Sequence, residues 1–134
     1  MKSNDDIDGE QNSIAEILAQ ARTRFVRVEP EMLANELANG TLIIDIRPAD
    51  QRLRDGELPG AVVIDRNLLE WRLDPNSEHH IAQVTGHDTR IVIVCNEGYS
   101  SSLAAASLQN LGLYRAIDMI GGFQAWLAIT RTDC

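Results

Sequence analysis

The 134-residue chain has little lysine, few aromatic residues and no apolar run long enough to span a bilayer. Lys2 is the single lysine among 12 basic residues, and 20 acidic residues bring the net charge to −8. Such a surface repels phosphate backbones and anionic lipid, which disfavours nucleic-acid and membrane binding. The acidic N-terminus also lacks the apolar stretch of a signal peptide, so we predict a cytoplasmic protein.

Cysteine is equally scarce. Cys95 and Cys134 are too few for a disulfide framework, although a bridge between the two remains an open alternative. The sequence does not say whether Cys134, the last residue, acts on Cys95 chemically. Cys95 therefore has to be explained from its own surroundings.

Length and composition predict one globular domain, since 44% of the residues are hydrophobic. Residues 1–12 are polar and acidic, and we expect them to be disordered, with the domain occupying residues 13–134. Ser13 and Glu16 form the pattern of a capping box at the start of the first helix.

Short apolar runs recur along the chain without alternating with polar residues. This pattern is typical of strands covered on both faces, as in a parallel sheet. We predict strands at 41–45, 61–65, 91–95 and, more weakly, 116–120 and 25–28. Helical patterns lie between or beside them, at 14–21, 30–39, 67–73, 99–111 and 123–130. The alternation predicts an α/β domain with a mainly parallel sheet.

The segment most informative about chemistry is the loop that follows the third of these strands. Cys95 ends the strand, and the loop leads through Gly98 directly into a Ser-rich helix. Ligands of open α/β sheets bind beyond the carboxyl ends of the strands. Backbone N–H groups from Asn96 to Ser101, together with the helix dipole, could form an anion-binding nest there. A thiol in such a nest is partly ionised near neutral pH and is a candidate nucleophile, although a buried cysteine is often inert.

Other chemistries have less support. A cysteine phosphatase or arsenate reductase needs an arginine six residues after the cysteine, and Ser101 stands there. The polar stretch that holds His79, His80 and His87 fits no metal template, and no nucleotide-binding motif is present. Asp45 and Asp65 end strands and are better suited to turns and caps than to Mg²⁺.

Four segments, in order, resemble the rhodanese-like (sulfurtransferase) family. They are LIIDIR at 42–47, GELPGA at 56–61, the loop at 95–101 and GGFQAW at 121–126. The resemblance covers residues 23–130 and implies a three-layer fold, with a central, mainly parallel sheet flanked by helices. It implies that Cys95 takes a sulfane sulfur from thiosulfate or another donor as a persulfide, and passes it to cyanide, a thiol or a protein acceptor.

The same resemblance assigns residues to the site. The backbone N–H groups of the loop would cradle the persulfide anion, with hydroxyls of the two serines adding hydrogen bonds; the loop residues are Asn96, Glu97, Gly98, Tyr99, Ser100 and Ser101. We expect Asp45 and Arg47 to be structural residues near the site. No metal or organic cofactor is implied.

The chain departs from the family pattern at Glu57, where the family has histidine, and in having no basic residue in the loop. Glu97 should repel dianionic thiosulfate, by ~1 kcal/mol at a solvated site, which favours a persulfide or a protein as donor. We expect Tyr99 to line the crevice mouth, and Trp71 and Trp126 to pack in the core or the crevice wall. The alternative to an enzyme is a non-catalytic rhodanese-like module that binds a partner.

Overall fold

The structure is a computed structural model and describes residues 12–131. At its centre is one sheet of four parallel strands in the order β2-β1-β3-β4. The strands are β1 (Leu42–Asp45), β2 (Val62–Val63), β3 (Ile91–Val94) and β4 (Ala116–Asp118). The predicted parallel α/β fold is confirmed. The expectations for residues 1–11 and for Cys134 lie outside the described residues.

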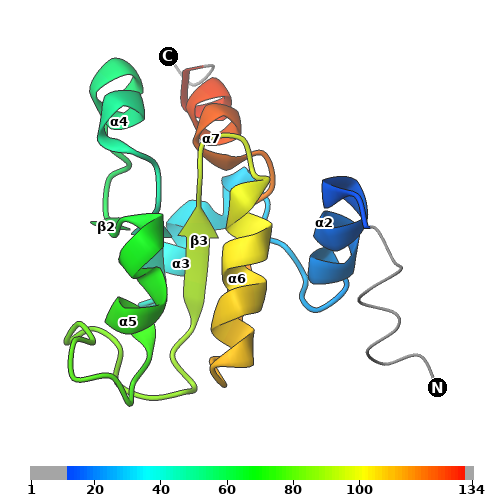
Figure 1. The fold of residues 1–134 in the computed structure, drawn as a ribbon. Helices are drawn as coiled ribbons and strands as arrows, with labels where there is room; N and C mark the ends of the chain where they lie inside the picture. Colours follow the sequence, from blue (N-terminus) through cyan, green and yellow to red (C-terminus); the bar gives the residue numbers. More distant parts are fainter. Residues whose placement is uncertain (1–11, 132–134) are drawn as a thin grey trace.

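Helices cover both faces of the sheet, which explains why the strands do not alternate (Figure 1). Ile91 and Ile93 of β3 face the core beneath α5 (Leu69–Leu73) and α6 (Ser100–Asn110). Val92 and Val94 face the second core, to which α3 (Leu33–Ala38) and α7 (Gly122–Arg131) contribute. Every position of β1 and β3 is buried, so each must be apolar or internally paired.

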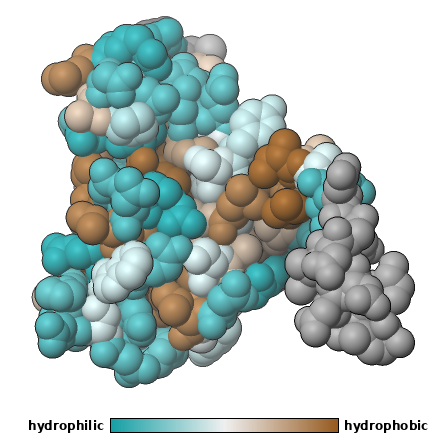
Figure 2. Space-filling model, viewed as in Figure 1, coloured by the Kyte–Doolittle hydropathy of each residue, from teal (hydrophilic) through white to brown (hydrophobic). Residues whose placement is uncertain are grey.

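Helix α2 (Ile14–Arg22) lies outside these layers and packs against α6. The predicted capping box is present: the Glu16 amide donates to Ser13 Oγ, and the Ser13 amide donates to Glu16 Oε1. Figure 2 shows apolar surface between α2 and α6, to which Ile17 and Leu103 contribute.

The structure corrects several expectations. The strand predicted at 25–28 is a single bridge between Val28 and Met119, and the strand predicted at 61–65 has only two residues. The predicted helix at 67–73 is divided into a 3-10 turn, η2 (Arg66–Leu68), and α5, just as η1 (Pro30–Met32) precedes α3. Helix α4 (Ala49–Asp55) was not predicted, because it buries no residue and so has no apolar periodicity.

The expectation for Trp71 was wrong, since this residue is 59% exposed. Trp126 is half-buried and packs on Phe123, with 5.4 Å between the ring centroids. Among residues 12–131, none of the helices is both long and apolar enough to cross a membrane.

Candidate functional site

The candidate site lies at the carboxyl edge of the sheet. The strands are parallel, so β1, β3 and β4 end on the same side and bring Asp45, Cys95 and Asp118 to one edge. Cys95 directly follows β3, is only 5% exposed, and is unpaired. The sheet therefore places a single thiol among charged groups at the edge where ligands of α/β proteins bind.

Two backbone amides point at the sulfur. The Gly98 and Ser101 amides donate to Cys95 Sγ at 3.1 and 3.3 Å. Gly98 has a φ of +87°, and a Cβ there would lie 2.7 Å from the Gly121 nitrogen, so both the turn and the packing require glycine. The nest predicted from the sequence thus has at least these two inward-facing donors.

Burial raises the pKa of the Cys95 thiol, but hydrogen bonding with Ser101, Ser100 and Gly98 lowers it by more. The pKa therefore lies below the ordinary value for cysteine. The Ser101 hydroxyl has one proton and donates it to Asp118 at 2.7 Å. We therefore assign the lower pKa chiefly to the amides and the Ser100 hydroxyl.

The thiol opens into a pocket of about 260 Å³. Asn96, Glu97, Tyr99 and Ser100 line one side of it, and residues 46–48 with Gln51 line the other. Tyr99 is 61% exposed, so its ring stands at the rim. Glu57, the departure from the family histidine, does not line this pocket and lies 3.7 Å from Arg52.

Arg47 forms one wall of the pocket but is held by its neighbours. Its Nη2 donates to Asp45 Oδ2 at 2.8 Å and to the Gly56 carbonyl at 2.9 Å, and both side chains of the ion pair are fully buried. The guanidinium also lies 3.6 Å from the centre of the Phe123 ring. Arg47 Nη1 is buried and has no hydrogen-bond partner among the described residues. The geometry is that of a buried ion pair joining β1, α4 and α7.

Helix α7 supports the loop from behind. The Phe123 amide donates to the Cys95 carbonyl at 2.8 Å, and the Gln124 amide donates to the Asn96 carbonyl at 3.0 Å. A Cβ on Gly122 would lie 2.5 Å from the Cys95 carbonyl oxygen, and Gly122 has a φ of +63°. The GGFQAW segment is therefore the support of the cysteine loop, which its turn pattern did not reveal.

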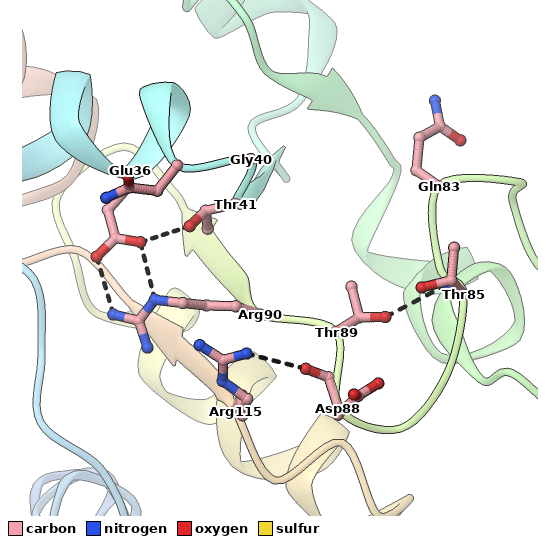
Figure 3. A pocket seen from close by; sticks show the side chains of 10 residues that line it. Glu36, Gly40, Thr41, Gln83, Thr85, Asp88, Thr89, Arg90 and Arg115 are labelled. Atoms are coloured by element: carbon pink, nitrogen blue, oxygen red, sulfur yellow. Dashed lines mark hydrogen bonds and ion pairs between the residues drawn. The ribbon is translucent and has the colours of Figure 1, made fainter.

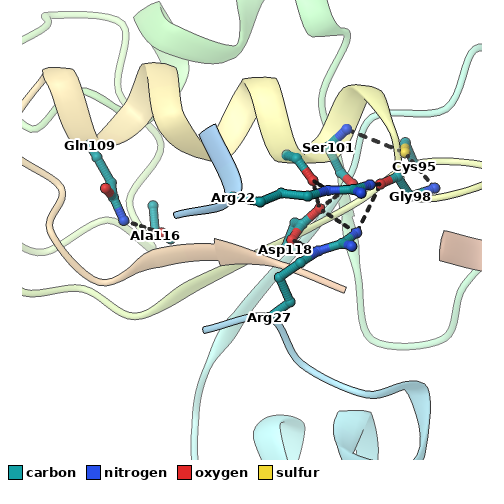
Figure 4. Close-up of polar contacts among 9 residues, drawn as sticks. Arg22, Arg27, Cys95, Gly98, Ser101, Gln109, Ala116 and Asp118 are labelled. Atoms are coloured by element: carbon teal, nitrogen blue, oxygen red, sulfur yellow. Dashed lines mark hydrogen bonds and ion pairs between the residues drawn. The ribbon is translucent and has the colours of Figure 1, made fainter. Parts of the chain in front are cut away.

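Three charged residues behind the loop were missed from the sequence. Asp118 is fully buried and accepts hydrogen bonds from Ser101, Ser102 and Arg27. Arg22 and Arg27 both donate to the Gly98 carbonyl (Figure 4). The only signal was an aspartate inside the weak run at 116–120, and nothing local linked it to arginines some 90 residues earlier.

A larger pocket, of about 570 Å³, lies where β1 and β3 begin, and it holds no cysteine (Figure 3). Arg90 pairs with Glu36 at 2.8 Å, and Arg115 donates to the backbone carbonyl of Asp88 at 3.2 Å. Within residues 12–131, no three His, Cys, Asp or Glu side chains are grouped to hold a metal. The pocket at Cys95 is therefore the better candidate for an active site, because it contains a thiol with a lowered pKa.

Comparisons with known proteins identify the family and the fold. Residues 29–129 match the model of the rhodanese-like domain family. The thiosulfate sulfurtransferase GlpE of Pseudomonas savastanoi pv. phaseolicola is 30% identical, over 79% of this chain and 91% of that one. A Rhodopseudomonas palustris protein of unknown function, a possible tyrosine phosphatase, is 29% identical with a TM-score of 0.80, over 90% of this chain and 93% of that one. The human single-domain sulfurtransferase TSTD1 shares the fold, with a TM-score of 0.65, at 24% identity over 76% of this chain and 95% of that one.

Proposed function

The chain belongs to the rhodanese-like domain family, and we propose that it is a sulfurtransferase that carries sulfane sulfur on Cys95. The observation that carries the proposal is the pair of amides that donate to Cys95 Sγ. They stabilise negative charge on the sulfur, first as thiolate and then as persulfide. The reaction needs Cys95 as a free thiol, and thiols stay reduced in the cytoplasm. The cytoplasmic location itself stays a prediction.

The reaction has two displacement steps. In the first, the Cys95 thiolate attacks the outer sulfur of the donor; a new S–S bond forms and the S–S bond of the donor breaks. The leaving group takes the bonding pair, as a thiolate from a persulfide or as sulfite from thiosulfate. In the second, a nucleophile such as cyanide attacks the outer sulfur of the persulfide, giving thiocyanate and restoring the thiolate. The protein supplies the nucleophile and the amide donors, and each step conserves charge without a metal or an organic cofactor.

Glu97 bears on the choice of donor. It is exposed and lines the pocket, where its charge repels a dianion. A persulfide such as glutathione persulfide, or a protein persulfide, is therefore the donor we propose over thiosulfate. The acceptor is a thiol, cyanide or a protein.

Two other functions have less support from the structure. A phosphatase, suggested by the name of the Rhodopseudomonas protein, needs a guanidinium directed at the phosphoryl oxygens. Here Ser101 stands at the arginine position, Arg47 is tied to Asp45, and Arg22 contacts the back of the loop. A non-catalytic module that binds a partner would not require a thiol stabilised by two backbone amides.

Intact-protein mass spectrometry tests the proposal directly. After incubation with thiosulfate, or separately with glutathione persulfide, we expect the protein to gain one sulfur atom and cyanide to remove it. The Cys95→Ser variant should gain none, whereas Cys134→Ser should load normally. Failure of both donors on folded protein would overturn the sulfurtransferase, and Cys95-dependent hydrolysis of p-nitrophenyl phosphate would replace it with a phosphatase.

A further inference from the structure

Two arginines of the N-terminal segment reach the back of the cysteine loop. Arg22 is the last residue of α2, and Arg27 precedes the bridge at Val28. Both lie before residue 29, where the match to the family begins. Each donates through Nη2 to the Gly98 carbonyl, at 2.7 and 2.8 Å, and Figure 4 shows the two side chains converging there. A segment outside the matched domain therefore contacts the loop that holds the nucleophile.

Gly98 is held from both sides. Its amide donates to Cys95 Sγ, and its carbonyl accepts from the two guanidinium groups. Glycine has a wider range of backbone conformations than any other residue, so these contacts fix a position where the chain itself restrains φ and ψ least. The arginines therefore fix the peptide unit that follows Gly98, and the amide N–H on the other side of its Cα faces the sulfur.

The two arginines differ in charge balance. Arg27 is paired with the buried Asp118, with Nε 2.9 Å from Oδ1. Arg22 donates to Ser102 Oγ at 3.0 Å and, among residues 12–131, no carboxylate lies within ion-pair distance of it. Its guanidinium also lies 5.8 Å from the centre of the Tyr99 ring at the pocket rim. Arg22 therefore adds an uncompensated positive charge behind the loop.

The other charged groups around the loop form neutral pairs or face outward. They are the Asp45–Arg47 pair after β1, the Asp118–Arg27 pair at β4, the Asp55–Arg54 pair of α4, which reaches the loop through Gln124, and exposed Glu97. Within residues 12–131, Arg22 and Glu97 are thus the two charges near the thiol that have no ion-pair partner, and they are of opposite sign.

We infer that Arg22 and Arg27 are positioning residues, which hold the Gly98 carbonyl and thereby keep the N–H of the same residue directed at Cys95, and that the charge of Arg22 stabilises the anionic sulfur. The part of this inference that concerns the persulfide rests on the proposed function; the part that concerns the thiolate does not. Arg22 is the better residue to test, because loss of Arg27 would leave Asp118 buried without its cation.

The experiment follows the pH dependence of alkylation of Cys95 by iodoacetamide. All proteins carry Cys134→Ser, so that Cys95 is the only thiol that iodoacetamide can alkylate. In Arg22→Gln we expect the midpoint to rise by about half a pH unit, and the rate below the midpoint to fall about threefold, because fewer thiols are ionised. Arg24→Gln is the matched control, because it removes the same charge two residues away. Arg24 is exposed and donates to the side chain of Asn110. This control variant should leave the midpoint unchanged.

Arg22→Lys separates position from charge. Lysine keeps the charge but lacks the planar fork that reaches Ser102 and Gly98 together, so we expect partial recovery. Full recovery would overturn the positioning half of the inference. Equal midpoints for Arg22→Gln and Arg24→Gln would overturn all of it, since a purely structural contact would change only the melting temperature.

Sulfur loading is measured on the same proteins. If alkylation responds as expected but no sulfur is ever loaded, the proposed function fails and this inference stands. If the original protein loads sulfur but the midpoints coincide, only the inference fails.

Discussion

At the residue scale, Cys95 is subject to opposing effects. Burial favours the neutral thiol, whereas donors at 3.1 and 3.3 Å favour the thiolate and lower its pKa. Because the amides belong to the backbone, they are present whichever side chains line the pocket. In the proposed sulfurtransferase, side chains at the rim could therefore select between donors without removing the amides that stabilise the thiolate.

Glu97 is the side chain that we expect to make that selection. In Glu97→Gln the repulsion of a dianion disappears, and we predict that KM for thiosulfate falls about fivefold while kcat changes little. Steady-state kinetics with cyanide as acceptor measures both constants. Glu78→Gln is the control, because Glu78 is exposed and does not line this pocket. An unchanged KM in Glu97→Gln would remove the electrostatic argument for a different donor.

At the scale of elements, the start of α7 and the end of β3 are built against each other. The backbone of Cys95 and Asn96 lies where a Cβ of Gly122 would be, and two amides of α7 donate to their carbonyls. No side chain separates the two segments. The position of Cys95 therefore depends on an element that follows it by almost 30 residues.

Gly122→Ala tests this close approach. The left-handed φ and the contact with the Cys95 carbonyl together should lower the free energy of unfolding by about 3 kcal/mol. Gly40→Ala is the matched control, since Gly40 has a φ of +84° with nothing within 4 Å of its added Cβ, and about 1 kcal/mol is expected. Urea unfolding measures both variants. Equal losses would show that backbone strain alone matters and that the steric contact does not.

At the scale of the whole molecule, Asp118 joins segments from three parts of the chain. From β4, it accepts from Ser101 and Ser102 of α6 and from Arg27 of the N-terminal segment. This carboxylate is fully buried, and the hydrogen bonds from all these donors offset the free-energy cost of removing its charge from water. The N-terminal segment, the cysteine loop and the sheet are thereby connected through one residue.

Asp118→Asn should lower the free energy of unfolding by about 3 kcal/mol, because it leaves the guanidinium of Arg27 without its counter-charge. Asp88→Asn, at an exposed loop position, should stay within about 0.5 kcal/mol of the original protein. Chemical denaturation compares the two. A small loss in Asp118→Asn would mean that the network tolerates a neutral partner.

Local patterns by themselves determined the parallel sheet, most of its helices and the loop of Cys95. Runs such as IVIVC predict strands correctly, because burial on both faces of the sheet requires an apolar residue at every position. Elements without a continuous apolar run were predicted less well. Helix α4 was missed because it buries no residue, and the strand predicted at 25–28 was too long because only Val28 pairs.

Only the tertiary structure decided which groups surround the thiol. Arg22 is 76 residues from Gly98 and Arg27 is 91 residues from Asp118, and no periodicity or motif relates positions so far apart. The same holds for Gly122, whose requirement for glycine arises from the Cys95 backbone rather than from its own turn alone. Hydrophobic patterning is a local property of the chain, whereas the charge and the fixed geometry around a buried sulfur depend on which distant segments the fold brings together.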